Sequence, residues 1–95
     1  MATVGVLTLD IRLAHAHSLK EKRSVIKGLK DRLRHRHNIA IAEIDGQDTW
    51  QRAVLAAVTV SADRARAARV LESVEREAAA DLGASLTDTA IEWLE

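Results

Sequence analysis

Residues 17–37, HSLKEKRSVIKGLKDRLRHRH, constrain the fold most strongly because they carry a complete helix signature. Ser18 followed three residues later by Glu21 is a capping box, in which the serine accepts from a backbone N–H and the glutamate reaches back to the cap. No proline interrupts the apolar residues that follow at helical spacing, with the stem of Lys22 in the same seam: Leu19, Ile26, Leu29 and Leu33. The sequence therefore predicts an amphipathic helix from about Ser18 to Arg36, with the Lys22 ammonium in water.

The same segment concentrates the positive charge of the chain. Eight of the 14 Lys and Arg residues lie here against only Glu21 and Asp31, so the segment carries +6 and the remainder, with six cations and 12 acids, carries −6. Five cations follow helical spacing beside the apolar seam and form what we call the cationic stripe: Lys20, Arg23, Lys27, Lys30 and Arg34.

Charge of one sign along a helix indicates a polyanionic partner, such as structured RNA or the ribosome. The predicted nucleic-acid contacts are the five residues of the cationic stripe together with Lys22. The alternative is a solvated helix face that only keeps the protein in solution.

Size and composition limit the class of protein. The chain has 95 residues and 47% hydrophobic content, which suits one folded domain over residues 1–95 and excludes disorder. No apolar run approaches the roughly 18 residues needed to cross a membrane. The start, MATVGVLTLDIRL, alternates like a strand and lacks the basic region of a signal peptide. The absence of cysteine excludes disulfides, thiol catalysis and cysteine-ligated zinc. We expect a cytoplasmic protein that contacts no membrane.

The other segments complete the order βαββαβ. Ser61 is the predicted cap of the second helix, and Gly83 sits where a left-handed C-terminal cap is expected. The predicted elements are a strand at Val4–Leu13, a hairpin of Asn38–Ile44 and Trp50–Val60 around the turn at 45–48, a helix at Asp63–Asp81 and a strand at Ser85–Leu94. This order predicts an α+β ferredoxin-like sandwich, a four-stranded antiparallel sheet with two helices on one face. Many functions occur on this fold, so the fold does not imply one.

The sheet face away from the helices has its own predicted composition. Alternation puts Val54, Ala56, Val58 and Val60 on one face and leaves the open face to Val6, Thr8, Asp10, Arg12, Leu55 and Ala57, with Ile91 and Trp93 as further candidates. Because the predicted central strands expose no aromatic side chain there, base stacking of the RNA-recognition type is not expected. An uncovered apolar surface favours the alternative function, a homodimeric or partner-binding regulatory module that uses the open face and the 43–52 hairpin.

The histidines occur as two pairs, His15 with His17 and His35 with His37. A helix of about 19 residues separates the pairs by roughly 28 Å, and one pair supplies only two ligands where zinc needs three or four. The sequence therefore predicts no metal site and no cofactor.

Carboxylates gather around the hairpin turn, where Glu43, Asp45 and Asp48 lie close to Arg52. Such a group has the ingredients for acid–base chemistry or for a hard cation, although these residues more often cap turns and pair with a nearby arginine. The sequence contains no nucleophile elbow, phosphate-binding glycine loop or dinucleotide fingerprint. We therefore expect a protein that is not an enzyme.

Two motifs, HSLKEKR at 17–23 and AEIDGQDTWQRA at 42–53, give the chain a specific resemblance. With VGVLTLDIRL before them, they resemble the YlxP-like bacterial family of unknown function over nearly the whole chain. The resemblance implies a small ferredoxin-like protein, typically encoded near translation and ribosome-maturation factors, and it supplies no reaction and no catalytic residue. It directs attention to the motif residues, of which Ser18 and the Asp-Gln-Asp turn also have structural interpretations: His17, Ser18, Lys20, Lys22, Arg23, Asp45, Gln47, Asp48, Trp50, Gln51 and Arg52.

Overall fold

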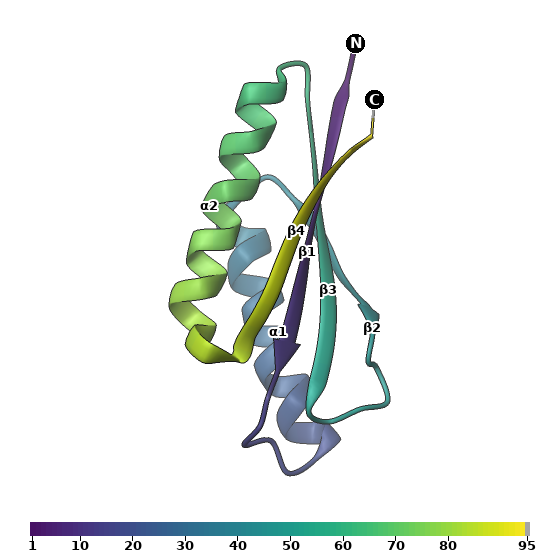
Figure 1. Cartoon of the computed structure of the whole chain (residues 1–95), viewed down its shortest axis with the longest axis vertical. Helices are drawn as coiled ribbons and strands as arrows, with labels where there is room; N and C mark the ends of the chain where they lie inside the picture. Colours follow the sequence, from purple (N-terminus) through teal and green to yellow (C-terminus); the bar gives the residue numbers. More distant parts are fainter. Residues whose placement is uncertain (95) are drawn as a thin grey trace.

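A computed structural model describes residues 1–94 and contains the predicted order of strands and helices (Figure 1). The sheet is antiparallel with strand order β2-β3-β1-β4, and both helices cover one of its faces. The elements are β1 (Thr3–Arg12), α1 (Leu19–Arg36), β2 (Ala40–Asp45), β3 (Arg52–Ser61), α2 (Arg64–Leu82), the short 3-10 helix η1 (Gly83–Ser85) and β4 (Leu86–Leu94). The protein therefore has the predicted ferredoxin-like α+β sandwich, with β1 and β3 at the centre of the sheet.

Capping explains where each helix begins. Ser18 caps α1 by accepting from the Glu21 N–H at 3.1 Å, and Glu21 accepts from the His17 N–H at 2.7 Å, one residue before the expected partner. The prediction that Ser61 caps α2 is wrong. Asp63 is the cap and accepts from the backbone N–H two residues later at 3.0 Å, because the chain leaves β3 at Ser61 and needs two residues to turn. Ser61 supports the turn by accepting from the Asp63 N–H at 3.1 Å.

The core lies between the sheet and the helices. The inward residues of β1, predicted from its alternation, are fully buried: Leu7, Leu9 and Ile11. Ala67 of α2 is also fully buried, and against the β1 residues pack the other predicted inner residues of both helices: Ile26, Leu29, Leu33, Leu71, Val74 and Ala78. Two helix seams on one apolar sheet face account for the layered fold.

The predicted faces of β3 are wrong. Leu55 and Ala57 are fully buried in the core, not on the open face. Leu55 pairs with Leu9 and Ala57 with Leu7, and paired residues project to the same side of a sheet. Because β3 has apolar side chains at both alternations, its own pattern does not define its inner face, and the register with β1 decides it.

The proposed open-face positions of Ile91 and Trp93 are also wrong. Ile91 pairs with Leu7, and Trp93 pairs with Gly5, so both face the helices and pack against the core. Gly5 makes room for the indole, since a Cβ at this position would lie 2.7 Å from a Trp93 ring carbon. The Arg64 guanidinium covers the ring at 4.7 Å from its centroid.

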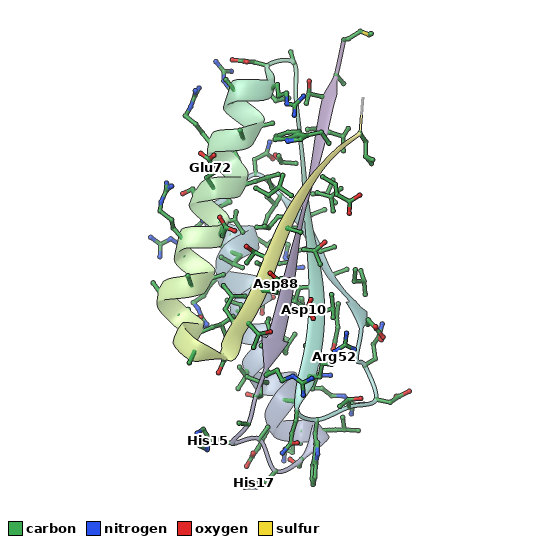
Figure 2. The ribbon with its side chains drawn as sticks, viewed as in Figure 1. Asp10, His15, His17, Arg52, Glu72 and Asp88 are labelled. Carbon is green, nitrogen blue, oxygen red and sulfur yellow. The ribbon has the colours of Figure 1, made fainter. Side chains whose placement is uncertain are left out.

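The open face of the sheet is consequently divided along its length. One end is apolar apart from Glu92, which pairs with Val6, and Val60 and Leu94 there are 55% and 57% exposed. The other end is charged, because Asp10 pairs with Asp88 across β1 and β4 (Figure 2) and Arg12 pairs with Arg52 across β1 and β3. The apolar residues of this face on β1 and β3 are Val4, Val6, Val54, Ala56, Val58 and Val60.

Candidate functional site

Lys22 lies at the centre of the contact between α1 and the turn that joins β2 to β3. Only 1% of its side chain is exposed, so the prediction that its ammonium stays in water is wrong. The Nζ atom donates to the carbonyl oxygens of Gly46 and Thr49, the latter at 2.6 Å, and lies 2.8 Å from Oε2 of Glu43. We call this arrangement the Lys22 cage. The turn folds over the helix and replaces water with two carbonyl acceptors and one carboxylate. The Oε2 atom of that carboxylate forms an ion pair with the ammonium but accepts no hydrogen bond from residues 1–94.

The turn itself is held by short-range hydrogen bonds. Asp45 accepts from the Gly46 N–H at 2.8 Å and from Nη1 of Arg52 at 3.3 Å. These two donors, the backbone N–H first, hold the pKa of the Asp45 carboxyl below its ordinary value. Gly46 has a φ of 82°, and a Cβ there would lie 2.8 Å from the Arg52 carbonyl oxygen. Asp45 and Arg52 therefore have a structural role in this turn.

The remaining residues of the second motif surround the cage. Gln47 donates from its side chain to the Glu43 carbonyl at 3.3 Å, and Gln51 accepts from the Leu13 N–H at 2.9 Å. Asp48 and Trp50 are exposed, Trp50 at 46%. The β1–α1 and β2–β3 connections lie at the same end of the molecule (Figure 1). The structure thus brings together the two motifs at 17–23 and 42–53, with Lys22 as their joint.

The cationic stripe runs along the flank of α1 that faces away from α2. Arg32 and Arg36, on the other flank, pair with Asp81 and Glu77 of α2. A groove of about 400 Å³ adjoins the stripe. It is lined by Glu43 of the edge strand β2 and by four residues of the stripe: Arg23, Lys27, Lys30 and Arg34. Lys20, at the start of the stripe, is exposed. The stripe is therefore presented to solvent beside a sheet edge.

One acid partly neutralises the stripe. Asp31 lies 2.8 Å from Nζ of Lys27 and 2.5 Å from Nη2 of Arg34, and the hydrogen bond from Lys27 is the main reason that the pKa of Asp31 is lowered. No carboxylate within residues 1–94 forms an ion pair with Lys20, Arg23 or Lys30. Their charge is therefore not neutralised by an ion pair within the described part of the chain.

The two histidine pairs lie apart, as expected. His15 and His17 precede α1 (Figure 2). His35 and His37 lie at the far end of α1, where Nε2 of His37 is 3.1 Å from Glu77. Within residues 1–94, no three His, Asp or Glu side chains are grouped so as to hold a metal ion. In the same part of the chain, neither helix is long and apolar enough to span a membrane.

Sequence reasoning missed a second group of cations. Arg66 and Arg69 of α2 face Arg36 and His37 across a pocket at the end of α1. The signal in the sequence was the first turn of α2, which has arginines and no acid. Only the packing of the two helices shows that these residues share one site.

Comparison with known proteins places the chain among its relatives. Residues 4–91 match the model of a family described as a protein of unknown function (DUF503). The chain belongs to the DUF503 family. It is 37% identical over 71 residues to the uncharacterized protein YlxP of Bacillus subtilis (strain 168), which covers 75% of this chain and 77% of YlxP. The predicted resemblance to YlxP-like proteins is confirmed.

Solved structures similar to this DUF503 chain show its fold alone. The de novo designed protein Foldit4 matches with a TM-score of 0.59 at 12% identity, covering 100% of this chain and 98% of the design. The de novo designed protein LFR1 1 with ferredoxin fold matches with a TM-score of 0.54 at 15% identity, covering 99% and 84%. Both are designs, so they support the ferredoxin-like fold and suggest no function.

Proposed function

We propose that this DUF503 protein is a non-enzymatic, cytoplasmic RNA-binding protein that contacts structured RNA, including ribosomal RNA, through the cationic stripe. The observation that carries the proposal is the placement of charge. Five cations share one flank of α1, four of them exposed and Lys30 half-buried. Lys20, Arg23 and Lys30 form no ion pair with residues 1–94. In a chain of zero net charge, such a concentration is a local field that attracts phosphates.

The contacts would be to phosphates and duplex shape more than to bases. No aromatic side chain lies on the open face of β1 or β3, where a base could stack. Lysine and arginine on a helix bind the sugar–phosphate backbone, which positions a protein without reading sequence. Affinity should therefore depend steeply on salt.

Lys22 has a different part in this proposal. Its ammonium is enclosed by the Lys22 cage, so it serves the interface by fixing the start of α1 against the hairpin. Phosphate contact then falls to the exposed residues of the stripe.

The test is the binding of a structured RNA and of ribosomal subunits to the purified protein, measured by fluorescence anisotropy and sedimentation over a range of salt. R23E/K27E/K30E should abolish binding and leave the circular dichroism spectrum unchanged. R23Q/K30Q should weaken binding and lower the salt slope by about one per residue removed. The control R12Q/R76Q lowers the net charge equally from exposed sites outside the stripe and should bind like the wild type. Equal binding by folded R23E/K27E/K30E and wild type would reject the proposal.

A second candidate, homodimerisation through the open face, is favoured by the division of that face. Valines fill most of one end, where Glu92 beside Val6 is the charge described on β1, β3 and β4, whereas the other end has two acids and two arginines: Asp10, Asp88, Arg12 and Arg52. A second copy related by a two-fold axis along the strands would place apolar end on apolar end and mixed charge on mixed charge. An axis across the strands would bury charges against valines.

Analytical ultracentrifugation tests this second candidate. The wild type should sediment as a dimer whose dissociation constant changes little with salt, because apolar burial is not screened. V58K should be monomeric. V25K adds the same charge on α1, where Val25 is 45% exposed, and should remain dimeric. A wild type that stays monomeric at high concentration would exclude this candidate.

A further inference from the structure

A pocket of about 310 Å³ lies where α1 ends against the N-terminal half of α2. Nearly every side chain that lines it is a hydrogen-bond donor: Arg36, His37, Asn38, Arg66, Arg69 and Ser73. Val70 is the one apolar residue of the lining. We call this the basic pocket.

The arginines of α2 in the basic pocket have no acid to balance them. Within residues 1–94, neither Arg66 nor Arg69 forms an ion pair, whereas Arg32 and Arg36 of α1 pair with Asp81 and Glu77. No carboxylate lines the pocket. Ion pairing within the described chain therefore does not account for these two arginines.

Arg66 has an unfavourable place on the helix. The first turn of α2 contains no acid, and Arg66 lies in that turn, three residues after the cap, Asp63, whereas Arg69 lies beyond it. The N-terminus of a helix is the positive end of its dipole, which disfavours cations and favours anions. Arg64 has a packing role over Trp93, but Arg66 and Arg69 point to no such contact. A bound anion would offset this unfavourable arrangement.

Part of the basic pocket is already ordered. Glu77 lies 3.5 Å from Nε of Arg36 and 3.1 Å from Nε2 of His37. The Thr59 hydroxyl donates to the Asn38 carbonyl at 2.8 Å, which fixes the connection after α1. A ligand entering the pocket would therefore mainly order Arg66 and Arg69.

We propose that the basic pocket binds a phosphate group held between Arg36, Arg66 and Arg69. Planar guanidinium groups match the oxygens of a phosphate and bind them in pairs. The pocket lies on the flank of α1 that faces α2, so it is a site separate from the cationic stripe. The phosphate belongs either to a small molecule, such as a mononucleotide or pyrophosphate, or to an RNA chain.

The experiment measures binding of inorganic pyrophosphate, of a mononucleotide and of a structured RNA to the full chain, by calorimetry and by NMR shifts of backbone amides. At least one of the three should bind and shift the amides of residues 36–38 and 66–73. R66Q/R69Q should weaken that binding at least tenfold. The control R76Q, an exposed arginine further along α2, should leave it unchanged. Binding of pyrophosphate or the mononucleotide indicates a small ligand, and an effect on RNA alone indicates a backbone phosphate.

Thermal unfolding separates this role from a structural one. Without ligand, R66Q/R69Q should melt at the same or a higher temperature than the wild type, because it removes the cation of Arg66 from the positive end of α2 and breaks no ion pair within residues 1–94. Wild-type affinity in R66Q/R69Q for every probe, or no binding of any probe to the wild type, would overturn the proposal. R23E/K27E/K30E should retain pyrophosphate binding, so a failed cationic stripe and a failed basic pocket give different results.

Discussion

Lys22 and Arg23 are neighbours on α1, yet they belong to opposite environments. Lys22 is buried in the Lys22 cage with three oxygen partners, while Arg23 is exposed on the cationic stripe and pairs with no carboxylate within residues 1–94. One residue along a helix is a rotation of about 100°, enough to move a cation from the core side to solvent. The comparison shows that a basic segment contains two kinds of cation, one that joins elements and one available to a partner.

The largest expected effect comes from removing the charge of the cage. K22M leaves the Glu43 carboxylate without its ion-pair partner and two carbonyl oxygens without their donor. Losing one partner of a buried pair costs about 3–5 kcal/mol of unfolding free energy. K20M removes an exposed lysine two residues earlier and should change stability by less than about 0.5 kcal/mol. Urea denaturation of both variants measures the difference. Equal stability of K22M and K20M would show that the cage contributes nothing.

The second largest expected effect is on stability and comes from changing Gly46, in the turn that encloses Lys22. G46A forces alanine into a positive φ and places its Cβ against the Arg52 carbonyl, which should destabilise the protein by about 1–3 kcal/mol. G28A, within α1, meets only the flexible end of Arg32 at 3.2 Å and should stabilise the helix by about 0.5–1 kcal/mol. Chemical denaturation of the two variants should therefore show opposite signs. A neutral G46A would mean that the turn relaxes without the glycine.

Removing charges from the cationic stripe should have only a small effect on stability. R23Q/K30Q removes one exposed and one half-buried cation, neither of which has an ion pair in the described chain, so its unfolding free energy should stay within about 0.5 kcal/mol of the wild type. The same variant should lose RNA affinity, which separates binding from folding. A loss of stability comparable to that of K22M would assign the stripe a structural role instead.

The smallest expected effect is on the pH dependence of stability, compared between the turn of the Lys22 cage and the cationic stripe. The pKa of Asp45 is lowered by the Gly46 N–H and then by Arg52, so the stability it contributes is present above its ordinary pKa of 3.8 and is lost as pH falls through the lower, folded value. D45N should therefore flatten the loss of melting temperature between neutral and acid pH. The pKa of Asp31, which lies beside the stripe, is also lowered, mainly by its hydrogen bond from Lys27, so its contribution to stability is likewise lost as the pH falls. Melting curves of D45N and D31N across this range compare the two, and an unchanged pH profile for D45N would contradict its role in the turn.

Local patterns in the sequence were sufficient for the fold. The capping box at Ser18 predicts the start of α1, and the alternation in β1 predicts which face of that strand is buried. The order of the elements is then compatible with one common architecture, the ferredoxin-like sandwich. β3 was beyond this reasoning because both of its faces are apolar, so only its pairing with β1 assigns Leu55 to the core. Element boundaries moved by one or two residues, as at Ala40 and Arg52.

The candidate sites depended more on contacts between distant residues. The burial of Lys22 follows from the carbonyls of Gly46 and Thr49, which lie 24 and 27 residues away, and no helical period reports them. The basic pocket likewise depends on the packing of α1 against α2, which brings Arg36 and Arg66 to one pocket. The cationic stripe, in contrast, is a property of one helix and could be predicted from spacing alone.

The Lys22 cage also gives the chain a chemical reporter. All four lysines of the sequence lie on α1. The amines of Lys20, Lys27 and Lys30 face solvent or the groove beside the cationic stripe, whereas the amine of Lys22 is enclosed. An amine-reactive reagent should therefore modify three side chains quickly and the fourth only when the hairpin lifts from the helix. The rate of the fourth modification, followed by mass spectrometry, measures how often this junction opens in an otherwise folded protein.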